Sequence, residues 1–455
     1  MMEQNQPHLK QGLGLAAATA LVMGNMIGSG IFMMPNTLAN ASGPGASLLA
    51  WVLTGIGSIV LALTFANLGS RYPKTGGPYA FSKLAFGEFT GFINAWSYWL
   101  GAIVGNAAIL TAFASYLSFF FPVIKENNLL AFLVTSAGLW LITWINIRGV
   151  REAGLLTLVT TVLKVLPLLV FVAIGARYFD LSIAGPMFPE SKGMETLSFA
   201  ATNTLWAFIG LESATVAAGE IKNPQRNVRL STIWGIGLTT ALYLAISLVA
   251  MGTMGQAELA ASNSPLADII NLHFGSWGSG FIALGALVST FGATIGWVLS
   301  TARMSFAAAE DGLLPKSLGA VHSRFATPHI SLIVSGILAN LVLALNYVDS
   351  LTTAYNFMIL LATLAFLPPY VFAAAAEIIL LTKRSAAFSV GTFIKSSFLS
   401  LVGFAYALWA IYGSGAEAVM YGFLLILAGI PVYLYMKLSA APAFPEAAAP
   451  LTKRD

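Results

Sequence analysis

Two long apolar stretches of this chain are each interrupted in the middle by glycines and polar residues. Residues 13–34 contain Gly-Asn-Met-Ile-Gly-Ser-Gly at positions 24–30, and residues 197–218 contain Ile-Gly-Leu-Glu-Ser at positions 209–213. Inside a bilayer every backbone N–H and C=O group needs a partner, so a broken helix persists only where it lines a cavity enclosed by protein. Two such breaks, in what look like two halves of the chain, predict a site for a small solute near the middle of the membrane. The pattern is typical of a transporter and not of an enzyme.

Two ionisable side chains, Glu212 and Lys164, lie well away from the ends of their apolar stretches, where a charge is costly. Glu212 belongs to the second interruption. Because burial disfavours an ionised carboxylate, Glu212 is predicted to sense protons and to couple protonation to the position of a gate; a structural, hydrogen-bonded glutamate is the alternative. Lys164 lies about 12 residues, or roughly 18 Å, from either end of its stretch, which is too far for its ammonium to reach the membrane surface. We therefore expect Lys164 to be paired inside the protein.

One face of a third apolar stretch carries further candidates. They recur at spacings of three or four, which places them on one side of a helix: Tyr98, Gly101, Ala102, Asn106 and Ile109. An amide at membrane depth needs a polar partner, so Asn106 is the strongest of them. Ordinary packing of small residues is the alternative, and it is the expected role of Gly91 and Gly105.

The composition indicates that these stretches are parts of a membrane protein. Of 455 residues, 57% are hydrophobic and 9% are charged, and the mean hydropathy is +0.81. This is far too apolar for a soluble globular protein. Runs of about 20 apolar residues can cross a bilayer, and we count twelve. They are residues 12–35, 46–69, 84–120, 129–146, 153–174, 195–219, 230–253, 278–306, 329–347, 351–381, 392–413 and 417–437.

The positions of the basic residues predict the orientation. Most of the 22 Lys and Arg residues fall in the N-terminus, the even-numbered loops and the C-terminus, so both termini are predicted to be cytoplasmic in a multi-pass protein of the cell (inner) membrane. The net charge of +4 follows from this topology and does not indicate nucleic-acid binding. Segment 1–11 is polar and the first apolar run is long, which argues against a cleaved signal peptide. Residues 438–455 are predicted to form a disordered cytoplasmic tail.

Four segments, taken in order, resemble the amino acid–polyamine–organocation superfamily of permeases. They are Gly-Ser-Gly-Ile-Phe at 28–32, Tyr-Pro-Lys-Thr-Gly-Gly-Pro-Tyr at 72–79, Trp-Ala-Phe-Ile-Gly-Leu-Glu-Ser at 206–213 and Lys-Asn-Pro-Gln-Arg at 222–226. The likeness is greatest to the bacterial basic amino acid/polyamine antiporters, such as arginine/agmatine exchangers. It implies an all-α membrane protein of 12 transmembrane helices with helices 1 and 6 discontinuous. Two inverted five-helix repeats, at 12–174 and 195–381, are followed by two peripheral helices at 392–437.

The resemblance also implies how the backbone at the breaks binds an α-amino acid. The half-helix that begins near Gly30 offers free N–H groups and the positive end of its dipole, so the substrate carboxylate is expected at Ser29 and Gly30. The ammonium is expected on carbonyl groups at Ile27 and Ile209. Glycine at Gly28 permits a close approach of the backbone.

Further roles follow from the same resemblance. Tyr98 and Trp206 become gates over the substrate, and Glu212 matches the acidic residue of the antiporters. The indole of Trp297 would stack on the substrate's side chain, a cation–π contact of up to about 2 kcal/mol. The predicted side-chain pocket comprises Gly101, Ala102, Asn106 and Ile109.

The chain departs from the arginine/agmatine exchangers at several of these positions. Ala362 stands where those exchangers have a serine, and Gly101 and Ala102 also differ, which leaves specificity open. Asn25 is expected to tie the first break to neighbouring helices. Packing within the membrane is the alternative for Trp206.

Lys164 is the largest departure. Some sodium-independent members of the superfamily have a lysine where sodium binds in sodium-coupled relatives. Lys164 is therefore predicted to replace sodium and to brace the first broken helix through a carbonyl near Gly28. Whether it also cycles a proton is left open.

Together these features predict a secondary transporter that exchanges a basic amino acid for a related amine or amino acid by alternating access. Proton-coupled or facilitative permeation of amino acids is the alternative, and a sensor that binds without transport is a more distant one. No cofactor is predicted. The four histidines lack metal-ligand spacing, and no phosphate-binding loop for ATP is present. The expected partners are the amino acid or amine, the lipid bilayer and, as an open option, a second copy in a homodimer.

Overall fold

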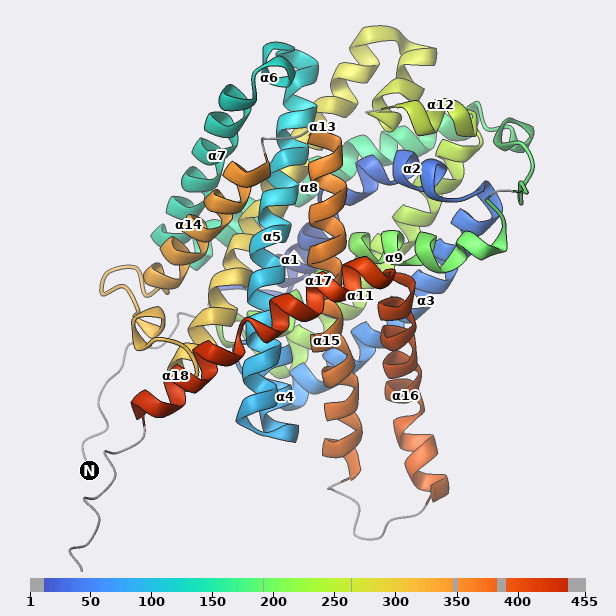
Figure 1. The fold of residues 1–455 in the computed structure, drawn as a ribbon. Coiled ribbons are helices and arrows are strands. Elements are labelled where there is room, and N and C mark those ends of the chain that lie inside the picture. The colour runs from blue at the N-terminus through green and yellow to red at the C-terminus, as the bar shows by residue number, and fades with distance from the viewer. Residues whose placement is uncertain (1–11, 191, 263, 347–350, 383–389, 441–455) are drawn as a thin grey trace, which may run out of the picture.

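The computed structural model describes residues 12–190, 192–262, 264–346, 351–382 and 390–440, and its regular elements in this part of the chain are helices joined by turns and loops (Figure 1). The α-helices are α1 (Leu15–Met26), α2 (Gly30–Ala41), α3 (Pro44–Arg71), α4 (Pro78–Phe86), α5 (Glu88–Phe120), α6 (Val123–Glu126), α7 (Asn128–Arg148), α8 (Val150–Arg177), α9 (Leu197–Phe208), α10 (Ser213–Val216), α11 (Pro224–Met251), α12 (Gln256–Ala261), α13 (Pro265–Glu310), α14 (His329–Asn346), α15 (Leu351–Thr382), α16 (Val390–Gly413), α17 (Ala416–Leu427) and α18 (Ile430–Ala440). Short 3-10 turns are η1 (Leu181–Ala184), η2 (Met194–Thr196), η3 (Ala218–Glu220) and η4 (Lys316–Gly319). The predicted N-terminal segment 1–11 lies outside the described residues.

Both predicted helix breaks are present. The first separates α1 from α2 at residues 27–29, and the second separates α9 from α10 at residues 209–212. At the second break Gly210 has φ +114°, and a Cβ placed there would lie 2.9 Å from Cβ of Asn25. Only glycine accepts both the backbone angle and this close approach, so Gly210 lets the two breaks lie against each other.

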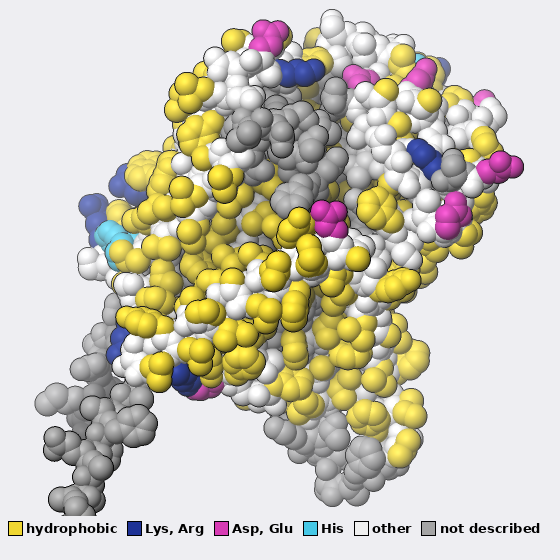
Figure 2. All heavy atoms as spheres, viewed as in Figure 1, with side chains coloured by type: hydrophobic (Ala, Val, Ile, Leu, Met, Phe, Trp, Pro, Cys, Tyr) yellow, Lys and Arg dark blue, Asp and Glu magenta, His cyan; other side chains and the backbone are white. Residues whose placement is uncertain are grey.

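The helices have the length and surface of an integral membrane protein. Within the described ranges nine helical segments are long and apolar enough to cross a membrane, and two shorter apolar helices cover His329–Leu345 and Ser397–Gly413. Figure 2 shows apolar side chains over most of the visible face. Large apolar residues point outward on many helices, such as Trp144 with 52% and Leu155 with 61% exposure. Such a surface is stable in contact with lipid and not with water.

Some predicted elements have different bounds. The apolar run at 84–120 begins inside a separate helix, α4, which ends at Gly87 with φ +93°. Residues 255–278, which fall between the expected spans at 230–253 and 278–306, contain α12 and the start of α13, where Gly275 with φ 66° kinks the helix. Residues 438–440 of the predicted tail belong to α18, and 441–455 lie outside the described residues. Hydropathy missed these elements because α4, α12 and the start of α13 are short.

The broken helices lie in the centre, where the other helices surround them. Helix α5 packs against α13 and α15, α11 packs against α1 and α3, and α8 packs against α1 and α13. Helices α17 and α18 cross the outside of this bundle (Figure 1).

One end of the bundle, which we call the α4 end, is closed by paired charges and by the backbone. Arg303 donates through Nη2 to Oε1 of Glu220 at 2.5 Å, with both side chains at most 1% exposed. The carbonyl of Glu220 accepts from the N–H groups of Gly12 and Leu13, each at 3.0 Å. Glu220 therefore links Arg303 of α13 to the residues that precede α1.

A second contact closes the same end. Tyr79 on α4 donates to Asp311, which also pairs with Lys83 at 2.9 Å. Burial, together with the hydrogen bond to Asp311, raises the pKa of the Tyr79 hydroxyl far above its usual range, so it stays protonated and donates. Helix α4 is thereby attached to the end of α13.

The opposite end, the α12 end, is closed by amide side chains. Asn36 and Asn40 on α2 donate to the carbonyl of Ala260 at 2.8 Å and 2.9 Å. Gln256 donates to the carbonyls of Ala39 and Ser42 at 3.2 Å and 2.9 Å. Helix α12 therefore covers the end of α2, and the centre of the bundle is closed from both sides.

Candidate functional site

A small cavity lies between the two breaks. Its lining comprises Asn25, Met26, Gly28, Ser29, Gly30, Ile109, Trp206, Ile209 and Trp297. All of these except Met26 were predicted from the sequence. The cavity volume is about 10 Å³, which is room for about one water molecule. An amino acid can enter only after side chains around the cavity move.

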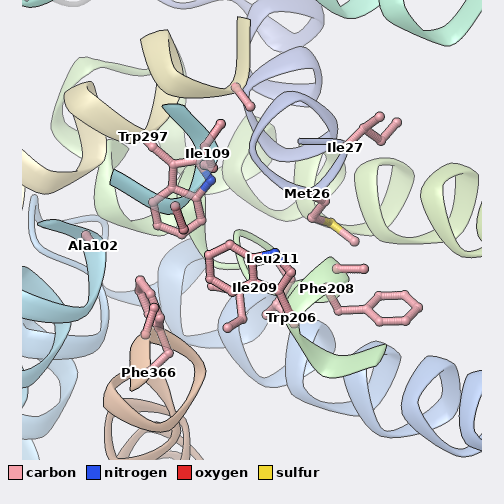
Figure 3. Close-up of a cluster of buried hydrophobic side chains, with 14 of the residues drawn as sticks. Met26, Ile27, Ala102, Ile109, Trp206, Phe208, Ile209, Leu211, Trp297 and Phe366 are labelled. Carbon is pink, nitrogen blue, oxygen red and sulfur yellow. The ribbon is translucent and has the colours of Figure 1, made fainter. Parts of the chain in front are cut away.

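Two indole rings, those of Trp206 and Trp297, lie beside the breaks and line the cavity (Figure 3). Trp206 lies against the start of α2, where a Cβ on Gly30 would be 3.2 Å from its ring. On its other side, a Cβ on Gly105 would lie 3.4 Å from the same ring. The sequence assigned Gly105 to helix packing, and the structure places it beside Trp206. Rotation of this one ring would open space next to Ser29 and Gly30.

Trp297 is held in place by the first break. Its Nε1 donates to the carbonyl of Asn25 at 3.0 Å, and its ring meets Phe366 edge-on at 5.3 Å. This hydrogen bond leaves the face of the indole available beside Ile109 and Ile209 (Figure 3). A cationic or long aliphatic side chain could stack there.

Lys164 makes the contact that the sequence predicts. The side chain is fully buried, and its Nζ donates to the carbonyls of Gly24 at 2.7 Å and Ile27 at 2.5 Å. These are carbonyls that the end of α1 leaves without helical partners. Lys164 thus holds the end of α1 from the side of α8.

The Ile27 carbonyl already has two donors. Besides Lys164, the hydroxyl of Ser289 on α13 donates to it at 3.1 Å and to the carbonyl of Gly28, also at 3.1 Å. A carbonyl oxygen has two lone pairs, so in this conformation Ile27 has no free lone pair for a substrate ammonium. Its side chain also points away from the cavity (Figure 3). The Ile27 contact expected from the sequence therefore requires a rearrangement, whereas Ile209 lines the cavity directly.

Glu212 lies at the centre of a hydrogen-bonded group outside the cavity lining. It is fully buried and accepts from Tyr98 Oη at 2.8 Å, Tyr370 Oη at 2.6 Å and Gly210 N at 3.2 Å. The ring of Tyr98 packs edge-on against Phe366 at 4.7 Å. Glu212 therefore joins α5 and α15 to the second break, which is a suitable place for a group that couples protonation to movement.

The two predicted asparagines each have an unused oxygen. Asn25 Nδ2 donates to Ser213 at 2.8 Å and Ser300 at 3.3 Å, which ties the first break to α10 and α13 as expected. Asn106 Nδ2 donates to Thr301 at 3.0 Å. In the part of the chain that the structure describes, the Oδ1 atoms of both residues are buried and have no protein donor. Asn25 lines the cavity and can accept a hydrogen bond from a polar ligand there, whereas Asn106 lies outside the cavity lining in this conformation.

The remaining predicted pocket residues pack between helices. Gly101 faces α15, where a Cβ would lie 2.8 Å from Cβ of Ala365 and 3.4 Å from the carbonyl of Ala362. Ala102 and Ala362 are fully buried, and none of the three lines the cavity. In this conformation they set the spacing of α5 and α15.

Tyr243 on α11 is a residue that sequence reasoning missed. Its buried hydroxyl lies 2.6 Å from the carbonyl of Met26 and 3.0 Å from that of Ala207, at the ends of α1 and α9. Its ring packs against Trp51 at 5.4 Å and Phe208 at 5.5 Å. One hydroxyl therefore holds both breaks. No sequence signal marks it, since a tyrosine in an apolar run is more often a packing residue.

We expect Tyr243→Phe to raise the KM for transport about tenfold, because it removes the hydroxyl from the buried carbonyl of Ala207, leaves that of Met26 with the Gly28 N–H as donor, and loosens the spacing of the breaks. Tyr412→Phe is the matched control, since that ring is 80% exposed on α16. Uptake kinetics in proteoliposomes measure both variants. An unchanged KM for Tyr243→Phe would show that its hydroxyl does not position the breaks.

Comparison with known proteins identifies the family. A family model described as amino acid permease matches residues 13–432. The chain is 34% identical to an arginine/ornithine antiporter of Pseudomonas aeruginosa, over 94% of this chain and 91% of the relative. It is 32% identical to an arginine/agmatine antiporter of Chlamydia abortus, over 93% and 90%. An L-lysine transport protein of Corynebacterium glutamicum is 30% identical over 92% and 88%. These matches confirm the resemblance found in the motifs, and the chain belongs to the amino acid permease family, whose members are transporters and not enzymes.

Proposed function

We propose that this protein exchanges a basic amino acid of the arginine, lysine or ornithine type for a related amine or amino acid. The observation that carries this proposal is the match over nearly the whole chain to relatives named as arginine/ornithine, arginine/agmatine and lysine transporters. The cavity between two broken helices supports it, because backbone groups there can bind both ends of a zwitterion.

We infer the following placement of the substrate. Its carboxylate binds at Ser29 and Gly30, at the N-terminus of α2. Its ammonium binds the Ile209 carbonyl, and its side chain extends past Trp297 towards the free Oδ1 of Asn106. Trp206 must turn away from Gly30 to admit it.

The proposed membrane arrangement has twelve spans in two inverted repeats followed by two peripheral helices. Both termini would lie in the cytoplasm, with the protein in the inner membrane. The distribution of Lys and Arg supports this orientation. In it the α4 end faces the cytoplasm and the α12 end faces outward, and alternating access requires each closed end to open in turn.

Proton-coupled uptake is the second candidate, and Lys164 is the observation that favours it. A buried ammonium bound to two carbonyls of the first break could exchange a proton during the cycle. Glu212 provides a second group that could do so.

Counterflow in liposomes separates these functions. We expect uptake of labelled arginine into proteoliposomes to require unlabelled arginine, ornithine or agmatine inside, because an exchanger returns only when loaded. Uptake driven by an acidic exterior alone would establish symport instead. Binding of arginine without uptake under either condition would establish a sensor and contradict the proposal.

A further inference from the structure

We propose that Arg148 and Arg324 form a binding site for the phosphate group of an anionic phospholipid. Arg148 ends α7, and Arg324 lies in the loop before α14. Their guanidinium carbons lie 5.7 Å and 5.4 Å from the centre of the Phe325 ring, and Arg148 also lies 4.9 Å from that of Trp144. We call these four residues the arginine–aromatic cluster.

The loop that carries Arg324 is fixed by hydrogen bonds of its own. The N–H of His322 donates to Thr327 O and the N–H of Ala326 donates to His322 O, both at 2.8 Å. The Nδ1 of His322 accepts from the N–H of Arg324 at 3.1 Å. The hydroxyl of Thr327 donates to the carbonyl of Ile147 at 2.8 Å. This last bond joins the loop to the residue before Arg148, so both arginines are held at one place.

Among the side chains that the structure describes, neither arginine forms an ion pair with an acidic residue. In the part of the chain that the structure describes, the ion pairs are Lys83–Asp311, Arg303–Glu220 and Lys437–Glu88. Both arginines are exposed. A guanidinium that stacks on an aromatic ring keeps its N–H groups directed outward in one plane, and this arrangement suits the oxygens of a phosphate. Two such groups held together by a fixed loop lose little freedom when they bind an anion.

The position of the cluster indicates a lipid as the source of the phosphate. Helix α7 has 21 residues, a length of about 31 Å at about 1.5 Å per residue, which matches the hydrocarbon thickness of a bilayer. Its outer face is apolar, with Leu133 at 53%, Leu141 at 49% and Trp144 at 52% exposure. Arg148 follows Trp144 by one turn, so it lies where the hydrocarbon ends and the headgroups begin.

The same face therefore offers sites for both parts of a lipid. Acyl chains can lie along Leu133 and Leu141 while the phosphate reaches the two guanidinium groups. Figure 2 shows basic side chains and a histidine at this edge of the molecule, next to apolar side chains. By the orientation proposed above, the lipid belongs to the cytoplasmic leaflet, where anionic lipids attract basic residues.

Native mass spectrometry of the full-length protein released from detergent tests this site. The probes are phosphatidylglycerol, phosphatidylcholine and inorganic phosphate, each at matched concentration. The variant is Arg148→Gln with Arg324→Gln, and the matched control is Arg226→Gln with Arg229→Gln, two exposed arginines of α11 that take part in none of the cation–π contacts above. Phe325→Leu keeps both charges and removes the ring that both guanidinium groups contact.

We expect the wild type and the control to retain phosphatidylglycerol over phosphatidylcholine, and the Arg148/Arg324 variant to retain at least about tenfold less of it. Phe325→Leu should lose an intermediate amount, and inorganic phosphate should bind detectably to none. Equal losses of phosphatidylglycerol in the variant and the control would show that general surface charge, and not this site, retains the lipid. Equal retention of phosphatidylcholine would remove the role of the anion, and binding of inorganic phosphate as strong as that of the lipid would assign the site to a soluble anion. Each of these results overturns the proposal.

Discussion

Replacing Lys164 by alanine is expected to lower the initial rate of arginine exchange at least about tenfold, because a buried carbonyl left without a donor costs about 1–3 kcal/mol. In the wild type, Lys164 Nζ holds the carbonyls of Gly24 and Ile27. Without it Gly24 loses that donor, Ile27 keeps only Ser289, and the end of α1 is free to move. Labelled arginine uptake into preloaded proteoliposomes measures the effect.

A matched lysine shows whether the effect belongs to the break. Lys192 also donates to a carbonyl, that of Ala39 at 2.7 Å, near the far end of α2. Lys192→Ala should retain most of the activity, since this bond lies outside the break. Lys164→Met, which keeps the volume but not the ammonium, should transport as poorly as Lys164→Ala. Full activity of both Lys164 variants would show that the ammonium of Lys164 is not needed for exchange.

Replacing Glu212 by glutamine is expected to flatten the pH dependence of exchange. The carboxylate accepts three hydrogen bonds, from Tyr98, Tyr370 and the Gly210 N–H. A change in its protonation alters all three at once and thus the link between α5, α15 and the second break. Glutamine cannot change its charge, so the exchange rate should vary less than about twofold from about pH 5 to about pH 8. Uptake rates across this range, with equal pH inside and outside, test the expectation.

Glu377 provides the control for this experiment. It is another buried glutamate, 2% exposed, which accepts from Asn67 at 3.1 Å and Ser400 at 2.7 Å between α3, α15 and α16. Glu377→Gln should keep the wild-type pH profile. If Glu377→Gln flattens the profile and Glu212→Gln does not, the proton sensor has been assigned to the wrong carboxylate.

The helix breaks could be predicted because glycines and polar groups stand out in an apolar run. The residues that hold the breaks could not be predicted in the same way. Ser289 and Tyr243 belong to stretches that look like ordinary apolar helices. A hydroxyl group in such a helix usually donates to a backbone carbonyl of the preceding turn. The hydroxyl of Thr294, for example, donates to the carbonyl of Thr290. Which hydroxyl instead reaches another helix depends on packing across the bundle.

The residues of the candidate site could also be predicted only in part from the sequence. Residues on the breaks line the cavity, because their backbone positions follow from the sequence pattern. Gly101, Ala102 and Ala362 lie between helices in this conformation, since a helix face alone does not say how far two helices stand apart. The closure of both ends, and hence the cavity of about 10 Å³, depends on contacts between distant segments such as Tyr79 and Asp311.

The buried ion pair of Arg303 and Glu220 affects the free energy that is needed to open the α4 end of the bundle. Taking two charges out of water carries a large penalty that their mutual attraction only partly offsets. Among the described residues, Nη1 of Arg303 and Oε2 of Glu220 have no protein partner, so each would gain hydrogen bonds when water enters. Hydration therefore returns much of the energy lost as the pair separates, and the shut and open forms stay close in free energy. An exchanger passes through both forms in every transport cycle, so an ion pair that separates readily when water enters favours transport.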